Sequence, residues 1–174
     1  NHPDPDALAA AFALKYLFQS KWKVGSIIAS SGVVGRAENR AMIRQLKIDL
    51  RPLSELNLKN FSRIALVDTQ PGAGNNPLPK SIIPDIVIDH HVPIRAKTRL
   101  AQYYDIRTDY GSTSTILAEY LRDAGIEEVD RLAREAGAGR SARGERQVAT
   151  GRVAQPRQRR LGAEQLRPAP RGRP

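Results

Sequence analysis

Short apolar runs alternate with longer segments of helical character along the first 130 residues. The runs Val24–Ala29, Ile64–Val67 and Asp85–Asp89 are rich in β-branched residues. The last two lack polar alternation, which is typical of strands covered on both faces. Residues Tyr103–Ile106 are predicted to form a further strand at an edge.

Three segments are predicted to be helices. Ala7–Ser20 consists mostly of good helix formers and is apolar on most sides, which indicates burial. The second, Arg36–Lys47, is amphipathic, and its inward residues are predicted to be Ala37, Met42, Ile43 and Leu46. The third, Ser112–Ala124, begins at hydroxyl residues suited to capping and ends at Gly125. Strands that alternate with helices predict an α/β protein with an open parallel sheet and helices on both faces.

The charge is distributed unevenly along the 174 residues. Residues 1–130 contain 16 Lys and Arg against 15 Asp and Glu, whereas residues 131–174 contain 12 Arg, no Lys and three Glu. The second segment consists mainly of Arg, Ala, Gly and Pro and has no helical or strand period. It is too poor in large apolar residues to offset the entropy of ordering, so we expect a disordered tail.

The composition also limits the chemistry. The chain has no cysteine, which excludes disulfides, thiolate nucleophiles and thiolate-bound metals. Carboxylate and imidazole groups would have to hold any metal, and they favour hard or borderline divalent ions. No apolar run is long enough to span a bilayer and the first residues do not resemble a signal peptide. We therefore expect a cytoplasmic protein without a membrane partner.

Acidic residues and histidines gather at the predicted strand ends. Asp68 follows one apolar run directly, and Asp89 ends another and leads into His90 and His91. In an open parallel sheet, ligands bind beyond the carboxyl ends of the strands. Each residue alone is equally explained as a helix cap, a loop carboxylate or an incidental His pair. Together they indicate a metal site.

A further acidic pair precedes the first predicted helix. Asp4 and Asp6 alternate with Pro3 and Pro5, which keep both carboxylates out of a regular helix or strand. Such spacing allows two carboxylates to reach two cations, although an N-capping Asp with an exposed neighbour explains it as well. Two Mn²⁺ or Mg²⁺ ions held in this way would suit hydrolysis of a phosphate ester or anhydride.

These motifs resemble the DHH phosphoesterase superfamily over residues 1–130. The sequence Asp89-His90-His91 matches the motif that gives the superfamily its name, while Pro3–Leu8 and Ala65–Thr69 resemble its first and second motifs. The superfamily includes RecJ-type exonucleases, nano-RNases that also hydrolyse 3′-phosphoadenosine 5′-phosphate (pAp), and manganese pyrophosphatases. Segments Gly35–Arg40 and Tyr110–Leu121 are most similar to the hydrolases of short oligonucleotides and pAp.

The resemblance implies a role for each of these residues. Asp4 and Asp6 would each bind a different Mn²⁺ ion, Asp68 would bridge the two ions, and His90 would bind the ion shared with Asp6. His91 would face the scissile phosphate, and Asp89 would orient the histidine pair. The turn at Gly111, Ser112 and Thr113 is a candidate phosphate contact because backbone N–H groups at a helix start attract anions, although a helix cap explains it equally well.

The sequence also departs from the superfamily pattern. The expected metal-binding His four residues before Asp4, the first strand, the fourth-motif Asp and the C-terminal substrate-binding domain have no counterpart in it. We therefore expect a partial DHH domain over 1–130 that is inactive as given, from a parent enzyme that cleaves short oligonucleotides or pAp. A RecJ-like single-strand exonuclease and a pyrophosphatase relative remain alternatives.

The Arg-rich segment 131–174 suggests two hypotheses of its own. Its abrupt change of composition is typical of a frameshifted reading of GC-rich DNA. Alternatively, the arginines would bind RNA or DNA through phosphate charge, without sequence specificity, because no aromatic residues are interleaved to stack on bases.

Overall fold

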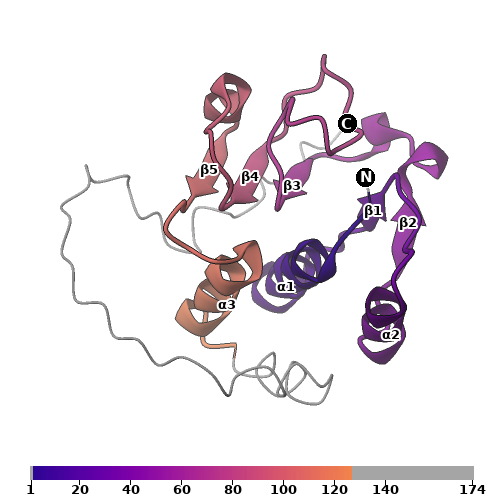
Figure 1. Ribbon diagram of the computed structural model, residues 1–174. Helices are drawn as coiled ribbons and strands as arrows, with labels where there is room; N and C mark the ends of the chain where they lie inside the picture. Colours follow the sequence, from indigo (N-terminus) through magenta and orange to yellow (C-terminus); the bar gives the residue numbers. More distant parts are fainter. Residues whose placement is uncertain (1, 127–174) are drawn as a thin grey trace, which may run out of the picture.

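The computed structural model describes residues 2–126, and these form an α/β fold with parallel strands (Figure 1). The prediction of an α/β class with a parallel sheet and helices is therefore confirmed. The predicted tail 131–174, with the frameshift and nucleic-acid hypotheses attached to it, lies outside the described residues. No helix within 2–126 is both long and apolar enough to cross a bilayer.

The predicted elements occur in the expected order, but the strand Leu50–Pro52 was not predicted, and the first strand starts at Ile28 and not at Val24. The α-helices are α1 (Pro5–Trp22), α2 (Ala37–Gln45) and α3 (Thr113–Asp123). The strands are β1 (Ile28–Ser30), β2 (Leu50–Pro52), β3 (Ala65–Val67), β4 (Ile86–Asp89) and β5 (Tyr103–Ile106). Short 3-10 helices are η1 (Leu53–Glu55), η2 (Leu58–Asn60) and η3 (Ala96–Leu100).

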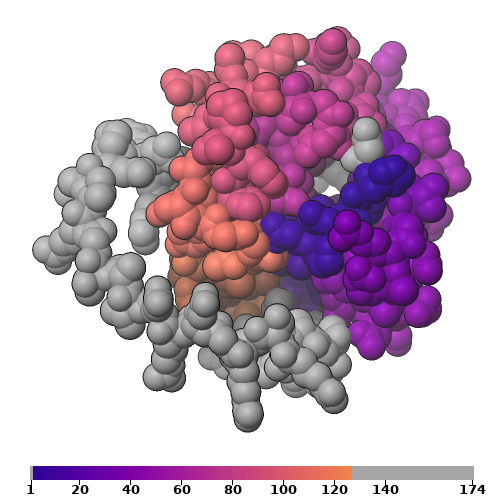
Figure 2. Space-filling model, in the orientation of Figure 1, coloured from indigo at the N-terminus to yellow at the C-terminus, as the bar shows by residue number. Residues whose placement is uncertain are grey.

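The structure divides the predicted sheet into two. Strand β1 pairs with β2, and β3, β4 and β5 form a second sheet in that order, with all pairs parallel. A cavity of about 880 Å³ separates the two sheets and is lined by residues of β1 and β3. Its opening is visible beside the indigo N-terminal segment in Figure 2. Strand β5 lies at an edge of its sheet, as predicted.

Helices α1 and α3 lie side by side against one face of the β3–β4–β5 sheet (Figure 1). The core between them is formed by buried residues of both helices and of β4 and β5, among them Leu14, Leu17, Ile86, Ile88, Tyr103, Ile116, Leu117 and Leu121. The opposite face is covered by η3 and its flanking loops rather than by an α-helix, with Val87, Ala101 and Ile106 buried there. Helices were predicted on both faces of the sheet. Within residues 2–126, α-helices cover one face, and a short 3-10 helix with its loops covers the other.

Helix α2 packs with α1 around a smaller core near β1. The buried members are Leu8, Ile28 and Ile48, and Met42, Ile43 and Leu46 of the α2 region pack against them as predicted. Ala37 was expected to face inward, but it is exposed, and the buried residue in the first turn of α2 is Asn39, whose amide nitrogen donates to the carbonyl of Pro3.

The helix ends are fixed by residues that the sequence identified. The side chain of Asp4 accepts a hydrogen bond from the backbone N–H of Ala7 and caps α1, with Pro5 in the first turn. Ser112 caps α3 in the same way through the N–H of Thr115. Gly125, with φ of 70°, follows the end of α3 in the left-handed conformation that favours glycine.

Candidate metal centre

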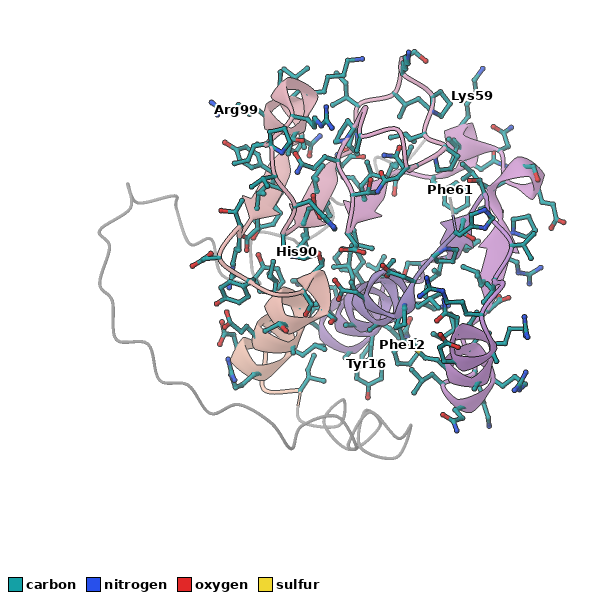
Figure 3. The ribbon with its side chains drawn as sticks, in the orientation of Figure 1. Phe12, Tyr16, Lys59, Phe61, His90 and Arg99 are labelled. Carbon is teal, nitrogen blue, oxygen red and sulfur yellow. The ribbon has the colours of Figure 1, made fainter. Side chains whose placement is uncertain are left out.

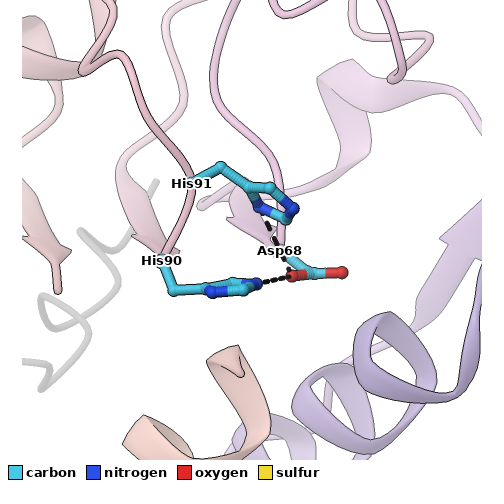
Figure 4. A group of neighbouring side chains, drawn as sticks. All are labelled: Asp68, His90 and His91. Atoms are coloured by element: carbon cyan, nitrogen blue, oxygen red, sulfur yellow. Dashed lines mark ion pairs between the residues drawn. The ribbon is translucent and has the colours of Figure 1, made fainter. Parts of the chain in front are cut away.

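The carboxyl ends of β3 and β4 bring an aspartate and two histidines together. Asp68 follows β3, and His90 and His91 follow β4, so the parallel register places them at one edge of the sheet. Their ligand atoms all lie within 4.8 Å of one another. Figure 4 shows the two histidine rings converging on the carboxylate of Asp68. This juxtaposition was predicted from the apolar runs that end at these residues.

Asp68 is held in an unusual backbone conformation. Its φ is 58°, which is rare for a residue with a side chain, while its N–H donates to the carbonyl of Ile88 at 3.0 Å. Strained backbone of this type costs on the order of 1–3 kcal/mol and clusters at functional sites. The left-handed turn lets the carboxylate leave the strand toward the histidines.

The orientation of His90 is fixed by the loop before α3. Its Nδ1 lies 3.0 Å from the carbonyl oxygen of Tyr110, which can only accept, so Nδ1 must carry the proton. When the ring is neutral, Nε2 therefore has a free lone pair. That atom lies 3.6 Å from Oδ1 of Asp68 and 3.8 Å from Oδ2 of Asp6. In Figure 3, His90 lies in the space between β4 and α3.

His91 is held from the opposite side by Asp89. Nδ1 of His91 lies 2.8 Å from Oδ1 of Asp89, whose side chain is fully buried, and 3.8 Å from Oδ1 of Asp68. The His91 side chain itself is 55% exposed. The hydrogen bond to Asp89 raises the pKa of His91. Asp89 thus fixes the His91 ring through this hydrogen bond, and the role that the resemblance implies for it stays a prediction.

Asp6 lies in the first turn of α1, although the neighbouring prolines were expected to keep it out of a regular helix, because proline is tolerated at the first helical position. Its carboxylate is anchored to α3. Its Oδ2 accepts from the N–H of Thr113 and its Oδ1 from the N–H of Ser114, both at 2.8 Å. The first turn of α3 therefore holds a carboxylate. The phosphate contact expected at Gly111, Ser112 and Thr113 stays a prediction, and the N–H of Thr113 already donates to Asp6. Oδ2 of Asp6 remains within reach of a cation shared with His90.

Asp4 is not a member of this cluster, although its charge adds to burial and to the charge of Asp6 in raising the pKa of Asp68. Its carboxylate caps α1 and is exposed, and it is not among the clustered ligand atoms of Asp68, His90 and His91. The cap and ligand interpretations of Asp4 both stood open at the level of sequence, and the geometry provides the cap. A metal-binding role for Asp4 stays a prediction.

The electrostatics of the site favour a cation. Burial, and next the neighbouring carboxylate of Asp6, raise the pKa of Asp68 to about 7. Burial also opposes ionisation of Asp6, but the hydrogen bonds from Ser114 and Thr113 outweigh it and lower the pKa of Asp6. Two carboxylates and an imidazole lone pair thus converge on one small space, which a divalent ion would neutralise.

The donor set fits a borderline or hard divalent ion. It combines carboxylate oxygen with imidazole nitrogen and contains no thiolate, which suits manganese and magnesium as well as zinc. Both imidazoles have their Nδ1 engaged by an oxygen, the arrangement that commonly orients a metal-binding histidine through its other nitrogen.

The comparisons with known proteins identify a relative without assigning an activity. No family model matches the chain. Over 133 residues, or 76% of its length, the chain is 41% identical to an uncharacterized protein of Methanocaldococcus jannaschii, MJ1633. The chain spans about a quarter (26%) of the length of that relative.

The structure adds Gln70 and Tyr110 to the site and gives Thr113 a contact that the sequence did not indicate. Gln70 is buried and contacts Asp89, the hydroxyl of Thr113 donates to Asp68, and the carbonyl of Tyr110 orients His90. Gln70 lies outside the motifs, and Tyr110 opens the segment Tyr110–Leu121, but the sequence assigned a role to neither, because a side-chain amide and a backbone carbonyl act here only through the path of the loops. Thr113 stood in a candidate turn, but its contact with Asp68 depends on the docking of α3.

Proposed function

We propose that the chain forms the metal-binding core of a phosphoesterase that hydrolyses phosphodiester or phosphomonoester bonds in short oligonucleotides or pAp. The metal would be manganese, in two ions, with magnesium as the alternative. The proposed ligands are Asp68 and His90 of the cluster, Asp6, whose Oδ2 lies 3.8 Å from Nε2 of His90, and Asp4 by resemblance. His91 and Asp89 would serve the substrate phosphate.

One observation carries this proposal. His90 donates its Nδ1 proton to the Tyr110 carbonyl, so its Nε2 lone pair is directed at the carboxylates of Asp68 and Asp6. Three electron-pair donors that face one another repel unless a proton or a cation lies among them. The hydrogen bonds that hold each donor in place belong to β4, α3 and the loop between, and they resist relaxation of the site.

The neighbouring residues supply the remaining requirements of phosphate hydrolysis. Bound divalent ions would polarise the phosphoryl oxygens and activate water. His91 is half exposed beside the cluster, so its ring can donate a hydrogen bond to a phosphate oxygen of a substrate. Asp89 lies behind it, fixes the ring through Nδ1 and stabilises its protonated form. The three functions of binding, orientation and proton donation thus fall on separate residues.

The substrate class is proposed from sequence resemblance. The motifs around Asp4, Asp68 and Asp89 are similar to those of DHH phosphoesterases, and Gly35–Arg40 and Tyr110–Leu121 are most similar to the oligonucleotide and pAp hydrolases. The chain spans about a quarter of the length of its Methanocaldococcus relative. The substrate that a whole protein of that length selects is therefore proposed from the resemblance of these motifs.

The decisive experiment combines metal binding with hydrolysis. Manganese binding to the 174-residue chain is measured by the loss of the free Mn²⁺ electron paramagnetic resonance signal, for the wild type and for Asp68→Asn, His90→Ala and the exposed control Gln45→Met. We expect binding in the wild type and the control and at least tenfold weaker binding in the other two.

Hydrolysis is then measured as phosphate release from pAp and shortening of a five-nucleotide RNA, with the chain and with the longer relative. The chain alone is expected to show little or no turnover, and the relative is expected to be active with Mn²⁺. Absence of saturable manganese binding to the chain, or absence of both reactions in the relative, would overturn the proposal.

A further inference from the structure

The side chain of Gln70 connects the loop after β3 to the end of β4. It is 2% exposed, and its amide nitrogen donates to Oδ2 of Asp89 at 2.8 Å and to the backbone carbonyl of His91 at 3.0 Å. Its amide oxygen accepts from the N–H of Arg95 at 2.8 Å and from the hydroxyl of Thr98 at 3.0 Å. Both amide protons and both acceptor positions are therefore used.

The partners fix which way the amide points. A carboxylate and a carbonyl only accept, so they must face the amide nitrogen, while the backbone N–H of Arg95 can only donate and must face the oxygen. A flipped amide would bring three pairs of like groups together. Because Gln70, Asp89 and Thr98 are all buried, water is poorly placed to replace any of these bonds.

The consequence for His91 follows from its exposure. Its ring is 55% exposed and Asp89 holds its Nδ1, so the direction of the ring depends on how firmly that carboxylate is held. Asp89 has one oxygen on His91 and the other on Gln70. Gln70 also holds the backbone of His91 itself. It therefore restrains the imidazole at both of its attachments, the main chain and the carboxylate.

We infer that Gln70 is a positioning residue: through Asp89 and the His91 carbonyl it holds the His91 imidazole in the direction that serves the metal centre and the substrate phosphate. The inference rests on the proposed function for the use that is made of His91. Its structural content, that Gln70 restrains the Asp89–His91 pair, is independent of any catalysis.

Two substitutions separate positioning from simple packing. Gln70→Glu keeps the acceptor for Arg95 and Thr98 but places a second carboxyl group 2.8 Å from Asp89 in place of a donor. Gln70→Met keeps the length of the side chain and removes all four hydrogen bonds. Gln45→Met, at an exposed position of α2, is the matched control. Thr98→Val removes one bond to the Gln70 oxygen and touches neither Asp89 nor His91.

The primary measurement is nuclear magnetic resonance of the metal-free chain at one fixed pH. A proton bound between Nδ1 of His91 and Asp89 gives a downfield resonance, assigned by its absence in His91→Ala. We expect it in the wild type and in Gln45→Met, broadened in Thr98→Val and absent in Gln70→Glu and Gln70→Met. An unchanged resonance in Gln70→Met, which removes all four hydrogen bonds, would overturn the inference. If the Gln70 variants fail to fold, an unchanged resonance in Thr98→Val would overturn the inference instead.

The second measurement couples the two residues. Loss of outer hydrogen-bond partners typically weakens metal affinity or activity by about 10- to 100-fold. We expect Gln70→Glu to weaken the binding of pAp to the manganese-loaded chain by about tenfold in the wild-type background and to add nothing in His91→Ala, because both changes remove the same oriented imidazole. Equal losses in both backgrounds would contradict action through His91. If the resonances behave as expected but the longer relative hydrolyses neither substrate, the proposed phosphoesterase function is wrong and the positioning role of Gln70 stands.

Discussion

The hydroxyl of Thr113 donates a hydrogen bond to Oδ1 of Asp68 at 2.9 Å, and both side chains are buried. Oδ1 is also the oxygen that lies nearest to His90 and His91. The same residue holds Asp6 through its backbone N–H. The first residue of α3 therefore contacts both carboxylates of the candidate metal centre, one through the main chain and one through the side chain.

This relationship predicts that Thr113→Val weakens metal binding. The hydrogen bond from Thr113 lowers the pKa of Asp68, so its removal lets a proton compete more strongly with a cation. We expect about tenfold lower affinity for Mn²⁺ near neutral pH, measured by isothermal titration calorimetry. Thr113→Ser keeps the hydroxyl and is expected to bind as the wild type does. Equal affinities of the Val and Ser variants would contradict the prediction.

The raised pKa of Asp68 predicts the pH dependence of stability in the metal-free chain. Burial first, and Asp6 second, move the pKa of Asp68 from 3.8 to about 7. The folded state then binds a proton that the unfolded state has lost, so the free energy of unfolding falls as the pH rises from about 4 to about 7. We expect a loss of a few kcal/mol from this residue, since one pKa unit is worth about 1.4 kcal/mol.

The comparison with Asp68→Asn isolates that contribution. Urea unfolding in the presence of a chelator, at several pH values from 4 to 8, should show the variant gaining stability relative to the wild type as the pH rises. Other titrating groups largely cancel in the difference. A difference that is constant with pH would show that Asp68 is not protonated in the folded protein near neutrality. Added Mn²⁺ should stabilise the wild type most at high pH, because the ion competes with the proton.

The carboxylates and histidines at the strand ends could be located from the sequence, because each buried apolar run stops where an acidic residue begins. The runs before Asp68 and through Asp89 are apolar up to the carboxylate, and parallel strands align their carboxyl ends. The helix caps at Asp4 and Ser112 were equally accessible, since a cap is a local interaction. The placement of these residues at strand and helix ends could therefore be predicted, whereas their metal-binding roles stay predictions.

Contacts across long stretches of loop could not be predicted. Gln70 meets Asp89 and Thr98 only because the segment between β3 and β4 and the segment around η3 fold over the same end of the sheet. Neither segment has a hydrophobic period that would fix its path. The division of the sheet at the cavity beside β3 was likewise not evident, because strand pairing depends on which edges meet and not on the pattern of either strand.

Asp4 provides a test that separates a cap from a metal ligand. Asp4→Ala removes the acceptor for the N–H of Ala7 and should lower the free energy of unfolding by about 1 kcal/mol, as for other N-caps. Asp4→Ser restores a good cap but has no carboxylate. We expect Asp4→Ser to be as stable as the wild type in urea unfolding. By resemblance it should nevertheless bind Mn²⁺ less tightly, and wild-type affinity in this variant would limit Asp4 to its role as a cap.

Arg107 is predicted to be the residue on which the loop before α3 depends most. Its guanidinium pairs with Asp105 and Glu119 and lies over the rings of Tyr110 and Tyr120, at 5.1 and 5.6 Å from their centroids. Only 18% of the side chain is exposed. Arg107→Met would leave two poorly solvated carboxylates without a partner, so we expect a loss of about 3 kcal/mol in the free energy of unfolding, measured in urea.

Three further variants of this network show whether the loss comes from the unpaired charges. Arg122→Met is the control, because Arg122 is 73% exposed and its contact with Glu119 is 3.9 Å, so it should change stability by less than about 1 kcal/mol. Adding Asp105→Asn to Arg107→Met should recover part of the loss, since it removes one of the stranded charges. Arg107→Lys should remain destabilised, because an ammonium group cannot reproduce the planar contacts to two carboxylates and two rings.

A folded Arg107→Met chain should also bind Mn²⁺ less tightly, since the carbonyl of Tyr110 orients His90. Wild-type stability of Arg107→Met would show that these contacts contribute nothing to the loop.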